Sequence, residues 1–243
     1  MPRFFVPGSQ VNGDAVCITG DDARHLIQVL RAKEGQAVEV SDGQYVYQTR
    51  VRSIGDGRVS LDIVKVSESN AEPSLFVTLY QAVAKGERMD WAIQKAVELG
   101  VGRIVPVLTK YTVVQLDEKK AQKRAERYQR IAAEAAKQCR RGRVPEVAAL
   151  VTFDEAVTTA DAPMKLIAWV QEGQQGQKDV LRSAHMPQKI DICIGPEGGF
   201  AAEEIETARL RGWRSVGLGP RVLRTETAGV VLLSVLMHWA GEM

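Results

Sequence analysis

The sequence lacks the features that mark secreted, membrane-spanning or metal-dependent proteins. It has only three cysteines, Cys17, Cys139 and Cys193, which are odd in number and show no CxxC spacing. We therefore expect free thiols in a reducing cytoplasm and no metal site. An amino-terminal apolar h-region and a long apolar run are also missing, so we expect neither secretion nor insertion into a membrane.

Net charge and repetition carry little information either. The formal net charge is +2, and the chain has no internal repeat and no low-complexity segment. Of its 243 residues, 45% are hydrophobic and 26% are charged. This is the composition of an ordinary soluble globular protein, with enough residues for one large domain or two small ones.

Two glycine–proline loops near the carboxyl end are the most informative features. The first occupies residues 195–199 and follows an apolar run at 190–194, which predicts a buried strand that ends in a loop. The second begins at residue 219 and follows a short predicted strand over 215–218. Between them, residues 201–211 are acidic at the start and basic at the end, which predicts a helix. Parallel strands would bring both loops to one edge of a sheet, where open α/β sheets bind ligands.

The composition of these loops limits what they can bind. Glycine lets a ligand approach the backbone, whose free amides and carbonyls can recognise a heterocycle. The first loop has neither the Gly-x-Gly-x-x-Gly spacing nor a Lys-Ser/Thr pair, so the two common phosphate-binding loops fit poorly. Two tight turns without a ligand are the alternative. Because Arg221, Arg224, Thr225 and Glu226 are concentrated in the second loop, a ligand site is favoured.

The amino-terminal and central parts of the chain predict different folds. Up to residue 72 the pattern is one of short strands punctuated by glycines and interrupted by one helix, as in a small barrel. Residues 67–73 are polar and end in proline, which indicates a linker. Strands and helices then alternate, which is typical of a parallel α/β domain. The predicted strands are 4–6, 15–18, 37–41, 45–51, 59–66, 75–82, 101–108, 165–170, 190–194 and 215–218, and the helices of the second domain include 89–99, 151–160, 179–184, 201–211 and 228–239.

Several segments resemble one family of RNA-modifying enzymes. IGPEGGF and LGPRVLRTETA are similar to the two signature segments of the ribosomal RNA small-subunit methyltransferase E family, the uridine-N3 methyltransferases of the SPOUT superfamily. PRFF, KGERMDWAIQKAVELGV and KQCRRGRVPEV resemble that family in the same order, so the resemblance spans nearly the whole chain. It implies a homodimer with a SPOUT-type, trefoil-knotted α/β methyltransferase domain at 73–243, preceded by a PUA-like RNA-binding β-barrel at 1–72.

The resemblance also implies a cofactor and a reaction. S-adenosylmethionine would donate a methyl group, without a metal, to N3 of a specific uridine in 16S ribosomal RNA of the assembled small subunit. Leu218 and Leu223 are expected to flank the adenine, and the strand that ends at Trp169 matches the family less well. The predicted cofactor-binding residues are Ala168, Trp169, Ile194, Gly195, Pro196, Glu197, Gly198, Leu218, Gly219, Arg221, Leu223, Arg224 and Thr225.

The chemistry at uridine N3 calls for a fixed positive charge. The N3 proton has to leave before or during methyl transfer, and the anion spreads its charge onto the neighbouring carbonyl oxygens, which suit a guanidinium. We predict Arg224 as the catalytic residue because it lies beside the donor loop, with Arg3 as a candidate partner from the barrel. A general base is not evident, since His185 and His238 lie outside the motifs.

Positive charge is concentrated between residues 110 and 143. Clustered lysine and arginine neutralise phosphates, so this stretch favours nucleic-acid binding, and a solvated charged helix is the alternative. Its end, 138–145, has three arginines beside a glycine and a proline, which is more typical of a loop aimed at an anion. The predicted RNA-binding residues are Arg3, Lys85, Arg88, Arg140, Arg141 and Arg143.

Two functions of other classes stay open at this point. A non-catalytic RNA-binding or ribosome-assembly factor would need only the barrel and the basic stretch, but it would leave the paired glycine loops without a use. A nucleotide-dependent phosphotransferase would need a Lys-Ser/Thr pair and a metal-binding aspartate after a strand, and the sequence shows neither.

Overall fold

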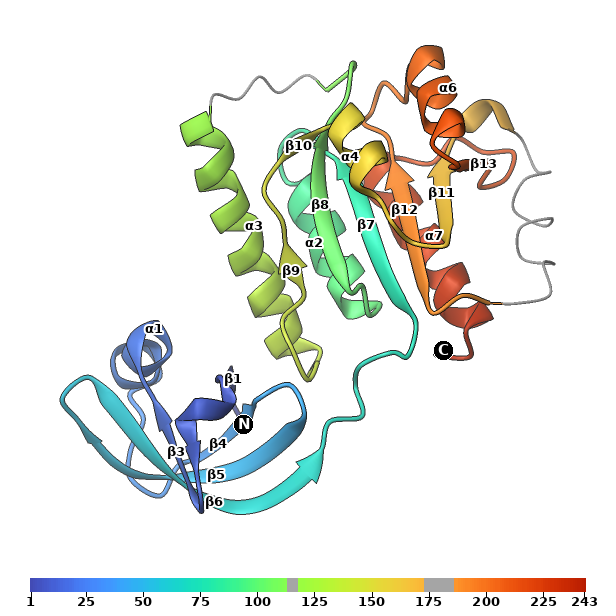
Figure 1. The fold of residues 1–243 in the computed structure, drawn as a ribbon. Helices are drawn as coiled ribbons and strands as arrows, with labels where there is room; N and C mark the ends of the chain where they lie inside the picture. Colours follow the sequence, from blue (N-terminus) through green and yellow to red (C-terminus); the bar gives the residue numbers. More distant parts are fainter. Residues whose placement is uncertain (113–117, 173–185) are drawn as a thin grey trace. The chain divides into compact units, whose positions relative to one another are not determined.

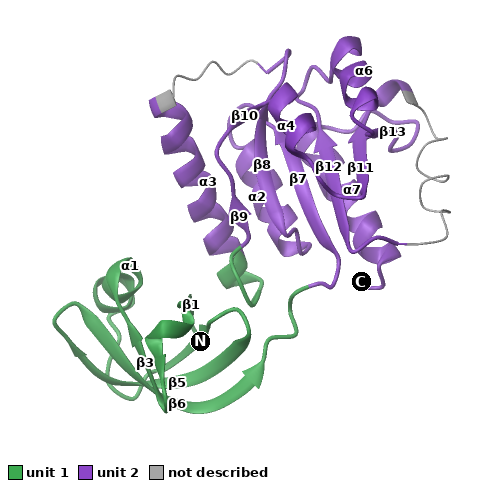
Figure 2. Ribbon diagram, viewed as in Figure 1, with its two compact units in different colours: residues 1–72, 136–144 green, residues 73–135, 145–243 purple. Residues whose placement is uncertain are grey.

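The computed structural model describes residues 1–112, 118–172 and 186–243. These residues form two compact units, shown in green and purple in Figure 2. The first unit contains residues 1–72 and 136–144, and the second contains residues 73–135 and 145–243. The chain therefore changes unit inside the predicted linker and returns to the first unit for the arginine-rich segment. The helix predicted at 179–184, and His185 beside it, lie outside the described residues.

A six-stranded sheet forms the first unit, in the order β1-β4-β5-β6-β3-β2. β1 pairs with β4 in parallel, and the other neighbours are antiparallel. Alternate residues of the strands face a common core in which Val16, Val38 and Leu61 are fully buried. One core shared by β1, β3, β4, β5 and β6 fits the predicted small barrel. The strands are β1 (Arg3–Phe5), β2 (Val11–Asn12), β3 (Ala15–Ile18), β4 (Ala37–Ser41), β5 (Tyr45–Gly55) and β6 (Arg58–Glu68).

The helical part of the first unit differs from the single helix that was predicted. α1 (Gly20–Arg24) has acidic residues in its first turn, where their negative charge interacts favourably with the helix dipole. It then continues as a π-helical segment, η2 (His25–Val29). Leu26 is fully buried, but Leu30 lies beyond the helix and is 38% exposed, because the wider turn breaks the spacing of the apolar face. A short 3-10 helix, η1 (Gly8–Gln10), completes this unit.

The sheet of the second unit is parallel throughout. Its order is β10-β8-β7-β12-β11-β13, and β9 also pairs with β8. The prediction of a helix from residue 151 is wrong at its start, because residues 151–152 pair with β8 and Thr152 caps the helix that follows. The strands are β7 (Phe76–Ala82), β8 (Arg103–Leu108), β9 (Glu146–Val147), β10 (Val151–Thr152), β11 (Met164–Ala168), β12 (Lys189–Ile194) and β13 (Arg214–Val216).

Helices cover both faces of this sheet, with α4 and α6 on one face and α2 and α7 on the other (Figure 1). A parallel sheet that is buried on both faces needs nearly continuous apolar strands, which explains the run in β12. No helix in the part of the chain that the structure describes is long and apolar enough to cross a membrane. The helices are α2 (Arg88–Glu98), α3 (Glu118–Gln138), α4 (Phe153–Thr159), η3 (Val170–Glu172), α6 (Ala202–Leu210) and α7 (Thr225–Trp239).

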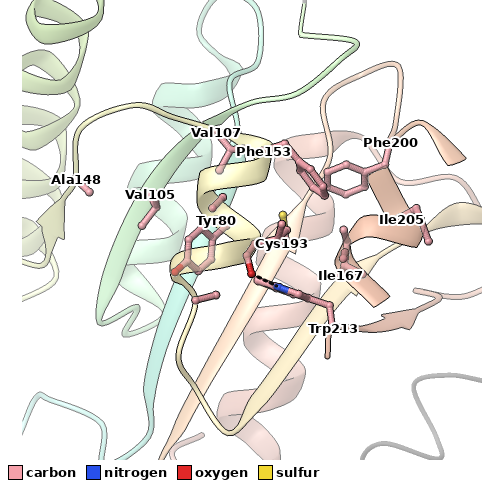
Figure 3. Close-up of a cluster of buried hydrophobic side chains, with 14 residues drawn as sticks. Tyr80, Val105, Val107, Ala148, Phe153, Ile167, Cys193, Phe200, Ile205 and Trp213 are labelled. Atoms are coloured by element: carbon pink, nitrogen blue, oxygen red, sulfur yellow. Dashed lines mark hydrogen bonds between the residues drawn. The ribbon is translucent and has the colours of Figure 1, made fainter. Parts of the chain in front are cut away.

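A cluster of buried side chains, with four aromatic rings, packs between the sheet and helices α4 and α6 (Figure 3). The rings of Tyr80 and Trp213 meet edge to face at 5.7 Å, and those of Phe153 and Phe200 lie 5.5 Å apart. Burial raises the pKa of the Cys193 thiol, so this cysteine is an inert core residue. Because Phe200 belongs to this cluster, the first glycine loop is anchored at both of its ends.

Candidate functional site

Three neighbouring strands of the second unit end at one cavity. It has a volume of about 560 Å³ and lies at the carboxyl ends of β12, β11 and β13, which are adjacent in the sheet. Every residue that was predicted to bind the cofactor lines it. Both glycine–proline loops therefore meet at one edge of the sheet, as the sequence predicted. The lining residues are 168–171, 194–200, 218–225 and Ala228.

Some lining residues were missed by the sequence analysis. They are Val170, Gln171, Gly199, Phe200, Pro220, Val222 and Ala228. Most are sequence neighbours of predicted residues, so the loops were identified but their limits were set too narrowly. Val170 and Val222 are 63% and 75% exposed, and apolar side chains at the mouth of a cavity offer a surface for an apolar part of a ligand.

The three glycines of the first loop lie where a side chain would be crowded or would strain the backbone. Gly199 has a φ of 71° and donates its N–H to the carbonyl of Pro196 at 2.9 Å. A Cβ at Gly195 would lie 3.1 Å from the Phe200 ring, and one at Gly198 would lie 3.0 Å from Cβ of Tyr111. The glycines of this loop are therefore required by close approach as well as by conformation.

Glu197 ties the first loop to the connection between β7 and α2. Its Oε1 accepts hydrogen bonds from the Lys85 N–H at 3.0 Å and from Nη1 of Arg88 at 2.8 Å. Burial opposes ionisation of this carboxyl, but the hydrogen bonds from Lys85 and Arg88 outweigh it, so the pKa of Glu197 is lowered. Two residues predicted to bind RNA thus lie beside the first loop, and Glu197 acts as a structural carboxylate.

The second loop ends in Arg224, whose position is not explained by helix stability. The predicted helix start at 228 is wrong, because the N–H groups of Thr227 and Ala228 already donate to the Arg224 carbonyl, at 2.9 and 2.8 Å, and α7 begins at Thr225. The Arg224 side chain makes no capping hydrogen bond, and a cation is disfavoured at a helix N-terminus. It is exposed, lines the cavity and forms no ion pair with any described residue.

Trp169 contributes the third wall. The backbone N–H of Trp169 donates to the carbonyl of Val216 at 3.0 Å, which joins the end of β11 to β13. The guanidinium of Arg209 lies 5.4 Å from the centre of its ring. The strand whose sequence matched the family less well therefore ends at the same cavity as the two loops.

Arg3 belongs to the first unit, whereas Arg224 belongs to the second. The Arg3 side chain is only 6% exposed, and its Nη1 lies 3.2 Å from Glu39 and donates to the carbonyl of Arg140 at 3.0 Å. Its Nε and Nη2 have no hydrogen-bond partner among the described residues. The residue predicted as a catalytic and RNA-contacting arginine is thus a buried group that holds its own unit together.

The arginine-rich segment is a loop fixed from several sides within the first unit. Glu72 Oε1 accepts hydrogen bonds from the Gly142 N–H at 2.9 Å and from Nε of Arg141 at 3.1 Å. The hydroxyl of Ser41 donates to the Gly142 carbonyl at 2.6 Å. Burial opposes ionisation of Glu72, but the hydrogen bonds and positive charge of Arg141 outweigh it, so the pKa of Glu72 is lowered.

This loop separates its arginines into two groups. Arg141 has a side chain that is 3% exposed, and its charge is neutralised by Glu72. Arg140 and Arg143 are exposed at the surface of the unit. Arg141, although predicted to bind RNA, is therefore buried inside the unit. Arg143 also pairs with Glu72, at 3.2 Å from Nε to Oε2, but its side chain is half exposed.

Two domain families match the chain. Residues 71–237 match the family described as an RNA methyltransferase domain, and residues 18–64 match the family described as an RNA methyltransferase PUA domain. A Bacillus subtilis protein named Ribosomal RNA small subunit methyltransferase E is 32% identical over 247 residues, which cover 98% of this chain and 96% of the relative. A protein of the same name from Synechocystis is 34% identical over 235 residues, 96% of this chain and 76% of the relative.

Solved structures are similar over the same length. The crystal structure of a Ribosomal RNA small subunit methyltransferase E from Neisseria gonorrhoeae bound to S-adenosyl methionine gives a TM-score of 0.85 at 31% identity and covers 98% of this chain and 97% of that one. A Legionella pneumophila protein, in complex with the bound cofactor SAM, gives a TM-score of 0.87 at 34% identity and covers 97% of this chain and 96% of its own.

Proposed function

This chain belongs to the ribosomal RNA small subunit methyltransferase E family, and we propose that it methylates N3 of a uridine in 16S ribosomal RNA. It is an S-adenosylmethionine-dependent RNA methyltransferase with an α/β methyltransferase domain and a PUA domain, as its motifs indicated. The observation that carries the proposed site is the cavity at the ends of β11, β12 and β13, because the two motif loops line it together.

The cavity fits S-adenosylmethionine in size and in lining. Its volume of about 560 Å³ lies within the range of small-molecule sites, roughly 300–1,000 Å³. Leu218 and Leu223 offer apolar surface to the adenine, and Gly195 and Gly198, which have no side chains of their own, line the cavity with backbone. When bound, the sulfonium supplies a methyl group that is already activated for displacement. The loops hold and orient the donor, and positioning of two reactants can contribute roughly 7–11 kcal/mol.

Arg224 is the residue that we assign to catalysis. It is exposed at the cavity without an internal partner among the described residues, so its charge is available to the uridine carbonyl oxygens as the N3 proton leaves. We assign Arg3 to a different role, because its buried guanidinium is engaged with Glu39 and the Arg140 carbonyl. Arg3 holds the arginine-rich segment in place through the Arg140 carbonyl and does not contact the reacting atoms.

Residues 1–72, together with the arginine loop at 139–143, form the proposed RNA-binding domain, and the rest of 73–243 forms the methyltransferase domain. Replacement of both exposed arginines, Arg140→Ala and Arg143→Ala, is expected to weaken binding to 16S RNA and to reduce the slope of log K against log salt by about 2, since each phosphate contact contributes about 1. Filter binding between about 50 and 200 mM salt measures this slope.

Arg58→Ala is the matched control for that experiment. Arg58 is also exposed and also in the first unit, but it lies at the β5–β6 turn, whereas the arginine loop packs beside Ser69 at the other end of this hairpin. Its replacement removes the same charge and should leave the salt slope unchanged. Equal slopes for wild type and the double variant would show that Arg140 and Arg143 do not contact phosphate.

The proposal also includes the trefoil knot, and a cytoplasmic setting follows from a ribosomal RNA substrate. It further includes a homodimer whose interface contains α7. Leu232, Leu233 and Leu236 are buried within the unit, so one side of α7 is an intramolecular core helix. Val231 and Val235, on the other side, are partly exposed, which supports an interface there. Light scattering of the purified chain measures the oligomeric state directly.

Donor binding distinguishes this function from that of an assembly factor without activity. Titration of the purified chain with S-adenosylmethionine in a calorimeter should show one site per chain. No detectable heat at concentrations that saturate ordinary methyltransferases would contradict the assignment of the cavity.

A further inference from the structure

Gln81 places a polar side chain among the apolar residues of the sheet face that packs against α7. It lies on β7, is 1% exposed and faces α7 together with Leu79. Burial of an amide that is not fully hydrogen-bonded is costly, so a glutamine in this position requires an explanation. Gln81 does not line the cavity, and its contacts show how it is nevertheless connected to it.

The Gln81 side chain begins a chain of hydrogen bonds that reaches both cavity loops. Its Nε2 donates to the Ala82 carbonyl at 3.2 Å and to Oγ1 of Thr225 at 2.9 Å. The Thr225 hydroxyl donates to the carbonyl of Gly195 at 2.6 Å. Gly195 is in the first loop, and Thr225 is the first residue of α7, directly after the second loop. These hydrogen bonds therefore connect both loops to a central strand of the sheet.

The groups involved determine the direction of each of these three hydrogen bonds. A carbonyl can only accept, so Thr225 has to give its single hydroxyl proton to Gly195. Thr225 can then only accept from Gln81, and the carbonyl of Ala82 can only accept as well. The amide nitrogen of Gln81 must therefore face both partners, and its Oε1 points away from them.

The Oε1 end of the amide explains a glycine in the middle of α7. Oε1 has no hydrogen-bond partner among the described residues, and a Cβ at Gly229 would lie 3.1 Å from it. Glycine in a helix interior is unfavourable relative to alanine. Its presence here is accounted for by the close approach of the Gln81 side chain to the helix.

We propose that Gln81 is a positioning residue of the donor site, which acts through Thr225. The inference rests on the assignment of the cavity to S-adenosylmethionine. By keeping the Thr225 proton on the Gly195 carbonyl, Gln81 fixes the first loop against the start of α7 before the donor binds. A loop that is already ordered loses less conformational freedom on binding, which raises affinity.

The first test is Gln81→Leu, which keeps the volume and removes the donor to Thr225. We expect about tenfold weaker binding of S-adenosylmethionine in calorimetry, the effect of one lost hydrogen bond, with an unchanged or higher melting temperature because an unpaired buried oxygen is removed as well. A merely structural Gln81 would instead give a lower melting temperature with wild-type affinity. Wild-type affinity in this variant would overturn the inference.

A double-mutant cycle tests whether the effect passes through Thr225. Thr225→Val removes the hydroxyl and should weaken donor binding, whereas Thr225→Ser should retain it. In the Thr225→Val background, Gln81→Leu should have no further effect on affinity. Additive losses would show that Gln81 acts by another route and would overturn the inference.

Gln81→Glu gives an independent test that does not depend on apolar packing. An ionised carboxylate can only accept, so it would draw the Thr225 proton away from Gly195, whereas a protonated carboxyl would donate as the amide does. Burial raises the pKa of such a group, so donor affinity relative to wild type should recover as the pH is lowered. A ratio that does not change with pH would contradict the inference. If the wild-type chain itself fails to bind the donor, it is the proposed function that fails.

Discussion

Arg224→Ala is expected to lower the rate of methyl transfer by about a hundredfold or more while the donor and the RNA still bind. The guanidinium would stabilise charge that develops only as the N3 proton leaves, so its loss should affect the transition state far more than the ground state. Single-turnover methylation at saturating donor and RNA measures this effect without interference from binding or product release.

Two further variants give the Arg224 result its meaning. Arg224→Lys should rescue the rate poorly, because a point charge on a flexible stem does not reproduce the planar guanidinium. Arg214→Ala removes an exposed arginine of β13 that does not line the cavity, and should react at the wild-type rate. If Arg224→Ala itself reacts at nearly the wild-type rate, or loses donor affinity in parallel with rate, Arg224 is not the catalytic group.

Gly195→Val is expected to abolish donor binding. Even the first carbon of the new side chain would lie 3.1 Å from the Phe200 ring and 3.3 Å from the backbone carbon of Gly199, so the branch has to enter the cavity or displace the loop. Either outcome removes the backbone surface on which the donor is proposed to lie. Calorimetry with S-adenosylmethionine checks the result, and a thermal melt shows whether the variant is folded.

Gly55→Val provides the steric control for this variant. A Cβ at Gly55 meets no atom within 4 Å, and its backbone conformation is ordinary, so the same substitution should be tolerated there. Donor affinity should then match wild type. If Gly195→Val also binds the donor with wild-type affinity, the first loop does not enclose it.

The cavity at the ends of β11, β12 and β13 was predictable from sequence because its determinants are local. An apolar strand that ends in glycines indicates both the end of β12 and the loop after it, and parallel strands place successive loops at one edge. The start of α7 was less clear, since the polar residues 225–227 have the composition of a loop. They form the first helical turn, in which the Arg224 carbonyl accepts the N–H groups of Thr227 and Ala228.

The contacts of other residues could not be predicted because their partners are distant in sequence. Arg141 resembles any other arginine of a basic stretch, but it is neutralised by Glu72, which precedes it by 69 positions. Arg3 is likewise buried against Arg140, 137 positions away. Gln81 is a polar residue in a largely apolar strand, and its hydrogen bond to Thr225, 144 positions further on, connects it with the cavity.

Methyl transfer by this chain to N3 of a uridine in small-subunit RNA can be measured directly. The measurement uses S-adenosylmethionine with a radioactive methyl group and small ribosomal subunits that lack the modification, followed by digestion and separation of the nucleosides. The label is expected to appear as 3-methyluridine with the wild-type chain, and far more slowly with Arg224→Ala. Label in a different nucleoside, or no transfer to RNA by a chain that binds the donor, would contradict it.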